Sequence, residues 1–283
     1  MPQQNVFVER ANCENSEGLG IGQQELFAGL SVILPAWRRI GAEVGIAVSS
    51  NFPIVFLVDV DNTLLDNDRI QQDLKEHLER ALGPAACDRY WKILEELFAE
   101  HGYRDYLGAL QRYRAEHPRD VELLSMSSYL IDYPFRDRLF PAALEVLKRL
   151  HSIGPTVILS DGDVVFQPRK IERAGLSHAV DGRVLVYIHK EDALDDVERR
   201  YPADHYVLVD DKLRILTAIK QFWRARVTTV FVRQGTYAHD PKVVGTFPPA
   251  DVTIERIGDL LDCDLPRLWS APPVGASRLE SAQ

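Results

Sequence analysis

Short apolar runs alternate with amphipathic segments of helical periodicity from Pro141 onward, and this alternation restricts the fold more than any other feature. The apolar runs, which are rich in β-branched residues, lie at 155–160, 182–188, 205–211, 226–232 and 250–254, and a similar run precedes them at 54–60. Strands that alternate with helices are typical of a parallel sheet with helices on both faces. We therefore predict an α/β fold with a Rossmann-like parallel sheet and right-handed crossovers.

A helical block separates the first apolar run from the second. Residues 69–130 contain no convincing strand pattern and carry four stretches with apolar residues at helical spacing. We predict the following organisation: an N-terminal extension of unidentified role at 1–50, an α/β core at 51–66 and 135–265, an inserted all-helical domain at 67–134, and a disordered tail at 266–283.

The composition is that of an ordinary soluble globular protein. The formal net charge of −9 argues against a broad nucleic-acid surface, because phosphate binding needs clustered Lys and Arg. Three scattered cysteines form no CxxC pair, which favours a reducing compartment. The apolar run at 26–37 is shorter than the roughly 20 residues that a bilayer-spanning helix needs. We predict a cytoplasmic protein with no membrane or nucleic-acid partner, while the oligomeric state stays open.

Polar and charged residues gather where the predicted strands end. These residues are Asp59 and Asp61 after the first strand, Ser160 after the second, Lys190 after the third, and Asp210 and Asp211 after the fourth. Because the carboxyl ends of parallel strands meet at one edge of a sheet, we expect the side chains to lie close together. Asp59 and Asp61 are two residues apart and would repel each other, so a metal ion or a proton is expected between them.

The order and spacing of these residues resemble the four motifs of the haloacid dehalogenase (HAD) superfamily. The segment DVDNTLL, which begins at Asp59, resembles the first motif; Ser160 resembles the second, Lys190 the third, and VLVDD at 207–211 the fourth. The intervals between the last three motifs, from 160 to 190 and from 190 to 210, also match. The resemblance covers about residues 54–261 and implies that the helical insertion is a cap domain.

The resemblance implies a phosphomonoesterase that acts on a small phosphorylated substrate through an aspartyl-phosphate intermediate. Asp59 would attack phosphorus, and Asp61 would protonate the leaving oxygen and then deprotonate the hydrolytic water. Ser160 and Lys190 would hold the phosphoryl oxygens. Because dehalogenases of this family release a halide that needs no proton, the acid at Asp61 favours phosphoryl transfer.

The resemblance also implies a Mg²⁺ site built from oxygen ligands. The ligands would be Asp59, the backbone carbonyl of Asp61, and an acid from Asp210 and Asp211, of which we favour Asp211. Many relatives carry a further acid four or five residues after the main acid of this motif; counted from Asp211, the present chain has Ile215 and Leu216 there. The adjacent pair would have to replace that acid.

Four residues beside these groups are candidates for substrate binding: Asn62, Thr63, Asp161 and Gly162. Asp161 and Asp163 add negative charge beside a phosphate site, which a cation, a second metal or a substrate ammonium group would have to offset. Alternatively, the chain turns at Gly162 and both aspartates cap the helix that begins near Gln167, or face water. We favour this alternative, in which the aspartates cap the helix or face water.

Two other functions stay open as alternatives. One is a different HAD chemistry, either a phosphomutase or a dehalogenase, and the other is a non-catalytic binding or regulatory protein on the same fold. Within the cap, the segment at 103–114 carries several Tyr and Arg residues, of which we expect one or two to face the cleft.

Overall fold

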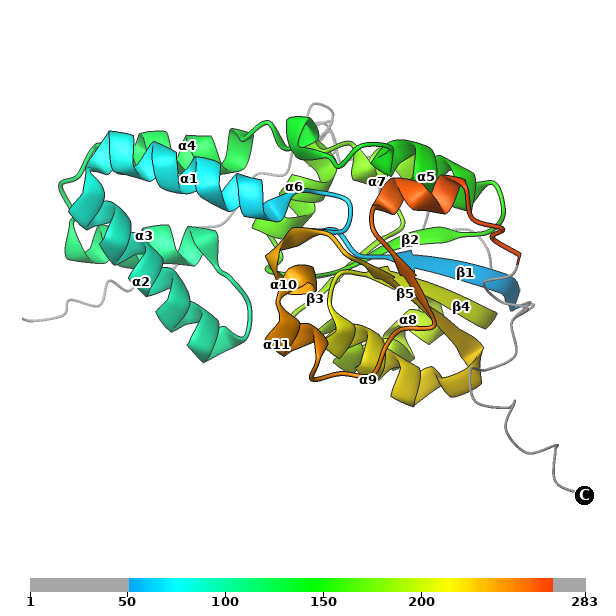
Figure 1. Ribbon diagram of the computed structural model, residues 1–283. Helices are drawn as coiled ribbons and strands as arrows, with labels where there is room; N and C mark the ends of the chain where they lie inside the picture. Colours follow the sequence, from blue (N-terminus) through cyan, green and yellow to red (C-terminus); the bar gives the residue numbers. More distant parts are fainter. Residues whose placement is uncertain (1–50, 267–283) are drawn as a thin grey trace, which may run out of the picture. The chain divides into compact units, whose positions relative to one another are not determined.

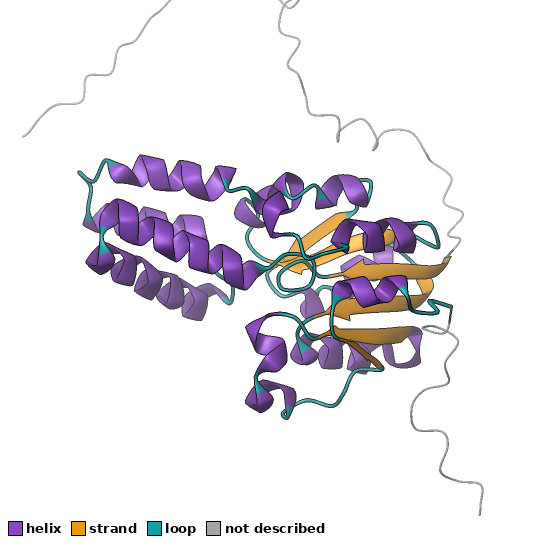
Figure 2. Cartoon of the chain, turned by 45° about the horizontal axis from the view of Figure 1, so that its top comes forward, coloured by secondary structure: helices purple, strands orange, loops and turns teal. Residues whose placement is uncertain are grey.

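The computed structural model describes residues 51–266, so the predictions made for residues 1–50 and 267–283 lie outside it. Six parallel strands form one sheet in the order β3-β2-β1-β4-β5-β6 (Figures 1 and 2). The strands are β1 Phe52–Val58, β2 Thr156–Asp161, β3 Val184–Tyr187, β4 Ala203–Asp210, β5 Val227–Val232 and β6 Val252–Ile254. The predicted α/β class with a parallel sheet is confirmed. No described helix is long and apolar enough to cross a bilayer.

The central strand β1 contributes side chains to two separate cores, one on each face of the sheet. Phe56 and Val58 belong to one core, and Val55 and Leu57 belong to the other, as the two-residue period of a strand requires. The first core includes side chains from α5 Ala143–His151, α6 Phe166–Arg173 and α7 Leu176–Ala179, and it continues into the inserted helical domain. The second core includes side chains from α8 Leu194–Arg200 and α9 Leu213–Trp223. Figure 1 shows α5 and α9 on opposite faces of the sheet.

Four consecutive helices follow β1 before the chain returns to the α/β core. They are α1 Asn67–Leu82, α2 Pro84–His101, α3 Tyr106–Glu116 and α4 Glu122–Asp132. The first two end at Gly83 and Gly102, which have φ angles of 86° and 80°. Positive φ values are accessible to glycine without a steric penalty, so these two residues can end one helix and redirect the chain into the next.

The other elements are short and include departures from the sequence-based boundaries. They are η2 Phe135–Arg138, η3 Lys190–Asp192, η4 Arg224–Arg226, α10 Gly235–His239, α11 Pro241–Val244 and η5 Ile257–Leu261. The helix predicted from Pro141 begins at Ala143 instead, because Ala142 has a φ of 65°. Near the end of the described chain, η5 is a single 3₁₀ segment, although the sequence there, ERIGDLLDCD, is compatible with an α-helix. Helices α10 and α11 are too short to show a periodic pattern in the sequence.

A buried carboxylate ties the outgoing chain of the helical domain to the returning chain. Asp73 on α1 accepts hydrogen bonds from Arg138 at 2.7 and 2.9 Å and from the Tyr133 hydroxyl, and it pairs with Arg69 at 3.0 Å. Burial alone would raise the pKa of Asp73, but the bonds from Tyr133 and Arg138, with the charges of Arg138 and Arg69, lower it below its usual value. Asp73 therefore cross-links the two connections to the core.

We expect Asp73→Asn to lower the free energy of unfolding by about 1–3 kcal/mol at pH 7, because charge-assisted hydrogen bonds are lost. A lowered folded-state pKa means that the stabilisation is present above the unfolded pKa and is lost as the pH falls through the folded value. Chemical unfolding at pH 7 and at about pH 3 measures this difference. Asp132→Asn, at an exposed carboxylate on α4, is the control. Equal stability of wild type and Asp73→Asn at pH 7 would contradict the cross-link.

Candidate active site

The candidate site lies at the carboxyl end of β1, where the order of the strands in the sheet reverses. From β1 the chain continues to β2 on one side and later to β4 on the other, so the carboxyl end of β1 is a topological switch point, where α/β proteins bind ligands. The register pairs Val58 with Ile158 and with Val209. The backbone N–H of Asp59 donates to Val209 at 3.0 Å. Asp59 therefore lies between the ends of β2 and β4.

Lys190 bridges two of the strand-end carboxylates. Its Nζ lies 2.5 Å from Asp59 Oδ1 and 2.6 Å from Asp210 Oδ2, and all three side chains are almost fully buried. Burial alone would lower the pKa of Lys190, but the charges of Asp210, Asp59 and Asp161 outweigh burial and raise it well above its usual value. The Lys190 ammonium is therefore charged and offsets part of the negative charge that surrounds it.

The remaining charge at this position fits a divalent cation. Asp59, Asp210 and Asp211 each present a carboxylate oxygen within 4.8 Å of the others, and all three are buried. Asp210 is already engaged by Lys190 and by the backbone N–H of Lys212. By contrast, among the described residues neither oxygen of Asp211 has a hydrogen-bond partner. A set of buried oxygens that needs positive charge suits Mg²⁺.

Burial raises the pKa of Asp211 well above its usual value; the charge of Lys212 opposes this effect, and the charges of Asp210 and Asp59 add to it. The ionised form of Asp211 is therefore poorly stabilised by the protein alone. A bound cation would provide the missing stabilisation, which is the physical argument for a metal ligand at Asp211.

Two hydroxyl groups flank the cluster. Thr63, which is fully buried, donates from Oγ1 to Asp59 Oδ2 at 3.1 Å, so it orients the carboxylate. Ser160 at the end of β2 accepts a hydrogen bond from Gln167 Nε2 at 2.9 Å. Ser160 therefore lies at the buried end of β2, whereas Thr63, in the turn after β1, contacts Asp59 and does not line the cavity.

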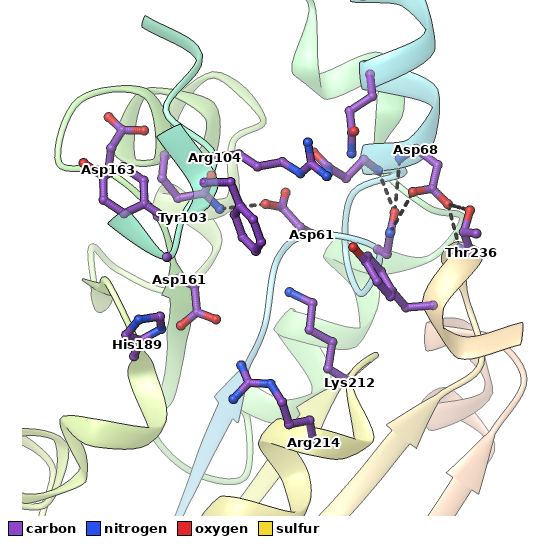
Figure 3. Close-up of a pocket in the computed structure, with 18 of the residues that line it drawn as sticks. Asp61, Asp68, Tyr103, Arg104, Asp161, Asp163, His189, Lys212, Arg214 and Thr236 are labelled. Atoms are coloured by element: carbon purple, nitrogen blue, oxygen red, sulfur yellow. Dashed lines mark hydrogen bonds between the residues drawn. The ribbon is translucent and has the colours of Figure 1, made fainter. Parts of the chain in front are cut away.

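A cavity of about 1010 Å³ opens between the strand ends and the helical domain (Figure 3). Four predicted site residues line it: Asp61, Asn62, Asp161 and Gly162. From the helical domain, Tyr103, Arg104 and Tyr106 also line it, whereas Arg112 pairs with Glu100 instead. The apolar part of the wall includes Phe98, Phe166, Leu213, Tyr237, Val243 and Phe247. Figure 3 shows the Lys212 side chain reaching into the cavity between Asp61 and Asp161.

Residues 55–233 match the family model described as a haloacid dehalogenase-like hydrolase. This chain belongs to the haloacid dehalogenase-like hydrolase family. A haloacid dehalogenase-like hydrolase from Burkholderia xenovorans is 64% identical, over 75% of this chain and 99% of that chain, with a TM-score of 0.72. The match establishes the family on the sequence and on the fold together.

More distant solved structures share the fold. L-2-haloacid dehalogenase from Xanthobacter autotrophicus is 19% identical, over 77% of this chain and 98% of that chain, with a TM-score of 0.50. A haloacid dehalogenase-like family hydrolase from Xanthomonas campestris is 15% identical, over 78% of this chain and 94% of that chain, with a TM-score of 0.53. No curated protein matches the chain.

This HAD-like hydrolase holds Asp61 with a lysine that the sequence analysis missed. Lys170 Nζ lies 2.7 and 2.9 Å from the two carboxylate oxygens of Asp61, and Gln167 Nε2 lies 3.2 Å from one of them. The Lys170 side chain is 2% exposed. A lysine within a helix is more often solvated, so nothing in the sequence singled it out. Only its position four residues after the apolar Phe166, on the same side of α6, could have indicated that Lys170 is buried.

The loop after Asp61 is held in an unusual conformation by its own hydrogen bonds. Asn62 has a φ of 60°, and its Oδ1 accepts from the backbone N–H groups of Asn67 and Asp68 at 3.0 and 3.2 Å. Asparagine tolerates this region better than most residues. Gly235 must be glycine, because a Cβ there would lie 2.5 Å from Asn62 Cγ. Although it lines the cavity, Asn62 thus uses its side chain to secure the start of α1.

The two aspartates after Ser160 have different roles. Asp163 accepts from the backbone N–H groups of Val165 and Phe166 at 2.8 and 2.6 Å, so it caps the start of α6, as the sequence analysis favoured. The same expectation is wrong for Asp161, whose Oδ1 accepts from the backbone N–H of Lys190 at 2.8 Å. Asp161 is the last residue of β2, and from there it holds the segment that carries Lys190.

Proposed function

We propose that this HAD-like hydrolase is a Mg²⁺-dependent phosphomonoesterase that acts on a small phosphorylated metabolite through an aspartyl-phosphate. The observation that carries the proposal is the different placement of the two first-motif carboxylates. Asp59 is buried against Lys190, whereas Asp61 lines the cavity where a leaving group would lie. An acid in that place serves an alkoxide leaving group and would be superfluous for a halide.

The proposed reaction has two steps, and Asp59 and Asp61 each have one role in each step. An oxygen of Asp59 forms a bond to phosphorus while the bond from phosphorus to the ester oxygen breaks, and Asp61 gives that oxygen a proton. Asp61 then takes a proton from the water that attacks the phosphoryl group and frees Asp59. Ser160 and Lys190 would stabilise the phosphoryl oxygens as their charge develops.

Asp59, Asp211 and the backbone carbonyl of Asp61 would hold Mg²⁺, with Asp210 beside them. The bound ion would supply positive charge that reduces the repulsion between the phosphoryl oxygens and the Asp59 carboxylate. The unpartnered oxygens of Asp211 support its role as a direct ligand.

The cavity supports a substrate of metabolite size. Its volume of about 1010 Å³ is at the upper end of the range for small-molecule sites. Its wall combines charged groups near the strand ends with aromatic side chains from the helical domain and from the segment after β5. We therefore propose substrates in which the phosphate is joined to a partly apolar group, with Tyr103 and Arg104 among the contacts.

A panel assay tests the proposed function directly. The wild-type protein is incubated with a panel of phosphate monoesters and of 2-haloalkanoic acids, and released phosphate and halide are both measured in Mg²⁺ buffer. We expect phosphate release from at least one ester and no halide release. Halide release without phosphate release would replace the proposal with a dehalogenase, and product exchange between sugar phosphates with no free phosphate would indicate a mutase.

Metal removal should abolish the activity and Mg²⁺ should restore it. Asp211→Asn should weaken Mg²⁺ binding by about 10–100-fold, because one charged oxygen ligand is lost from the site. Isothermal titration of the metal-free protein with Mg²⁺ measures the affinity independently of turnover. Asp163→Asn, at the helix cap of α6, is the matched control and should bind Mg²⁺ as the wild type does. An unchanged affinity in Asp211→Asn would remove this residue from the ligand set.

A further inference from the structure

We propose that Lys170 is a positioning residue that aims the Asp61 carboxylate at the leaving oxygen of the substrate. The inference rests on the proposed phosphatase function and extends it to a residue outside the four motifs. Lys170 also borders the cavity, but its ammonium group contacts both oxygens of Asp61, so we infer that its effect on the reaction passes through Asp61.

The contacts of Lys170 fix the orientation of the Asp61 carboxylate. Its ammonium group lies 2.7 and 2.9 Å from the two oxygens of Asp61 and 3.3 Å from Asn67 Oδ1. Because one cation contacts both oxygens, it restricts rotation of the carboxylate about its terminal bond. Gln167, one turn earlier on α6, donates from Nε2 to Asp61 Oδ2 at 3.2 Å and to Ser160 Oγ at 2.9 Å. Helix α6 therefore holds the acid of the first motif and the hydroxyl of the second together.

Burial makes this support rigid. Lys170 is 2% exposed in its side chain, whereas Asp61 is 24% exposed and faces the cavity. The Lys170 ammonium also lies 5.7 Å from the centre of the Phe166 ring, which in turn packs against Tyr106 of the helical domain at 5.1 Å between ring centres. Placing a long, flexible side chain in one buried position costs conformational entropy, and a surface ion pair gives little in return. A role in positioning Asp61 explains why the lysine is buried here.

Positioning predicts a specific kinetic signature. In the first step Asp61 gives its proton to the ester oxygen as the bond to phosphorus breaks, and this matters most when the leaving alkoxide is a strong base. An alkyl phosphate needs the proton, whereas p-nitrophenyl phosphate has a leaving group that departs readily without one. Loss of the support should therefore slow cleavage of the alkyl ester far more than cleavage of the nitrophenyl ester.

The experiment compares kcat/KM for the two esters, because kcat/KM reports on the steps up to release of the alcohol. For Lys170→Met we expect the alkyl value to fall about a hundredfold and the nitrophenyl value to fall less than about fivefold. In the Asp61→Asn background the same substitution should have almost no further effect, since it acts through Asp61. Lys220→Met is the matched control. Lys220 lies on α9 and pairs with Asp251 at 2.7 Å, and neither of these two residues lines the cavity.

The outcomes separate the inference from the function on which it rests. An equal loss for both esters in Lys170→Met, or an additive loss in the double variant, would make Lys170 a merely structural residue and overturn the inference. If wild type released phosphate from neither ester nor from any other in the panel, the proposed function would fail and the inference with it. Lys170→Gln, which keeps a hydrogen-bond donor, provides a second variant if Lys170→Met does not fold, and the same difference between esters is expected in a weaker form.

Discussion

Asp59→Asn is expected to reduce phosphate release by more than about a thousandfold, because it removes the charge of the proposed nucleophile while keeping its shape. The variant should fold at least as stably as the wild type in the absence of Mg²⁺. The reason is that Asp59 lies within 4.8 Å of two other buried carboxylates, so neutralising it relieves like-charge repulsion, while Lys190 keeps its ion pair with Asp210 at 2.6 Å. Phosphate release and chemical unfolding, measured on the same preparation, test both expectations.

The comparison of rate with stability guards against a trivial result. A variant that lost activity because it unfolded would say nothing about the nucleophile. Thr63, which donates to Asp59 at 3.1 Å, offers a graded control: Thr63→Val should slow the reaction much less, because the carboxylate keeps its charge. Activity near the wild-type level in Asp59→Asn would show that the nucleophile is misassigned.

Lys190→Met is expected to have the second largest effect, on both turnover and stability. The substitution leaves Asp59 and Asp210 buried without the cation that lies 2.5 and 2.6 Å from them. Breaking a buried ion pair on one side costs about 3–5 kcal/mol of unfolding free energy. The loss of a charge that would stabilise the transferring phosphoryl group should lower kcat by about a hundredfold or more.

The metal dependence of stability identifies the cause of the Lys190→Met effect. Saturating Mg²⁺ should recover part of the lost unfolding free energy, because the ion would offset the same carboxylates. The double variant Asp59→Asn, Lys190→Met should also be more stable than Lys190→Met alone. A Lys190→Met protein within about 1 kcal/mol of wild type without Mg²⁺ would contradict the cation's role in the buried cluster, since that cost is expected to be several times larger.

The strand-end residues were predictable from the sequence because a physical rule converts their order into proximity. Buried parallel strands have continuous apolar sequences, and their carboxyl ends meet at one edge, so the sequence predicts that Asp59, Ser160 and Asp210 lie close together. Lys190 follows the same rule, since it begins the segment directly after β3. The structure brings these side chains to one place.

The contact between Lys170 and Asp61 could not be predicted from the sequence. Whether a helical lysine faces water or a carboxylate depends on how the helix is rotated against the sheet, and in α6 the sequence pattern does not determine that rotation. Asp161 was misinterpreted for a related reason, because its hydrogen bond goes to the backbone of Lys190, a partner 29 residues away in the chain. Ala142 likewise has a positive φ that its residue type would not suggest. Each of these features depends on contacts between distant segments.

If Asp59 attacks phosphorus, the product of that attack, an aspartyl-phosphate, can be trapped during turnover. The enzyme is mixed with the most rapidly hydrolysed ester of the panel, quenched in acid during turnover, digested and examined by mass spectrometry. We expect a phosphoryl group on the peptide that contains Asp59, and no such group in Asp59→Asn. An unmodified peptide during rapid turnover, or one that carries the carbon skeleton of the substrate as an ester, would contradict this expectation.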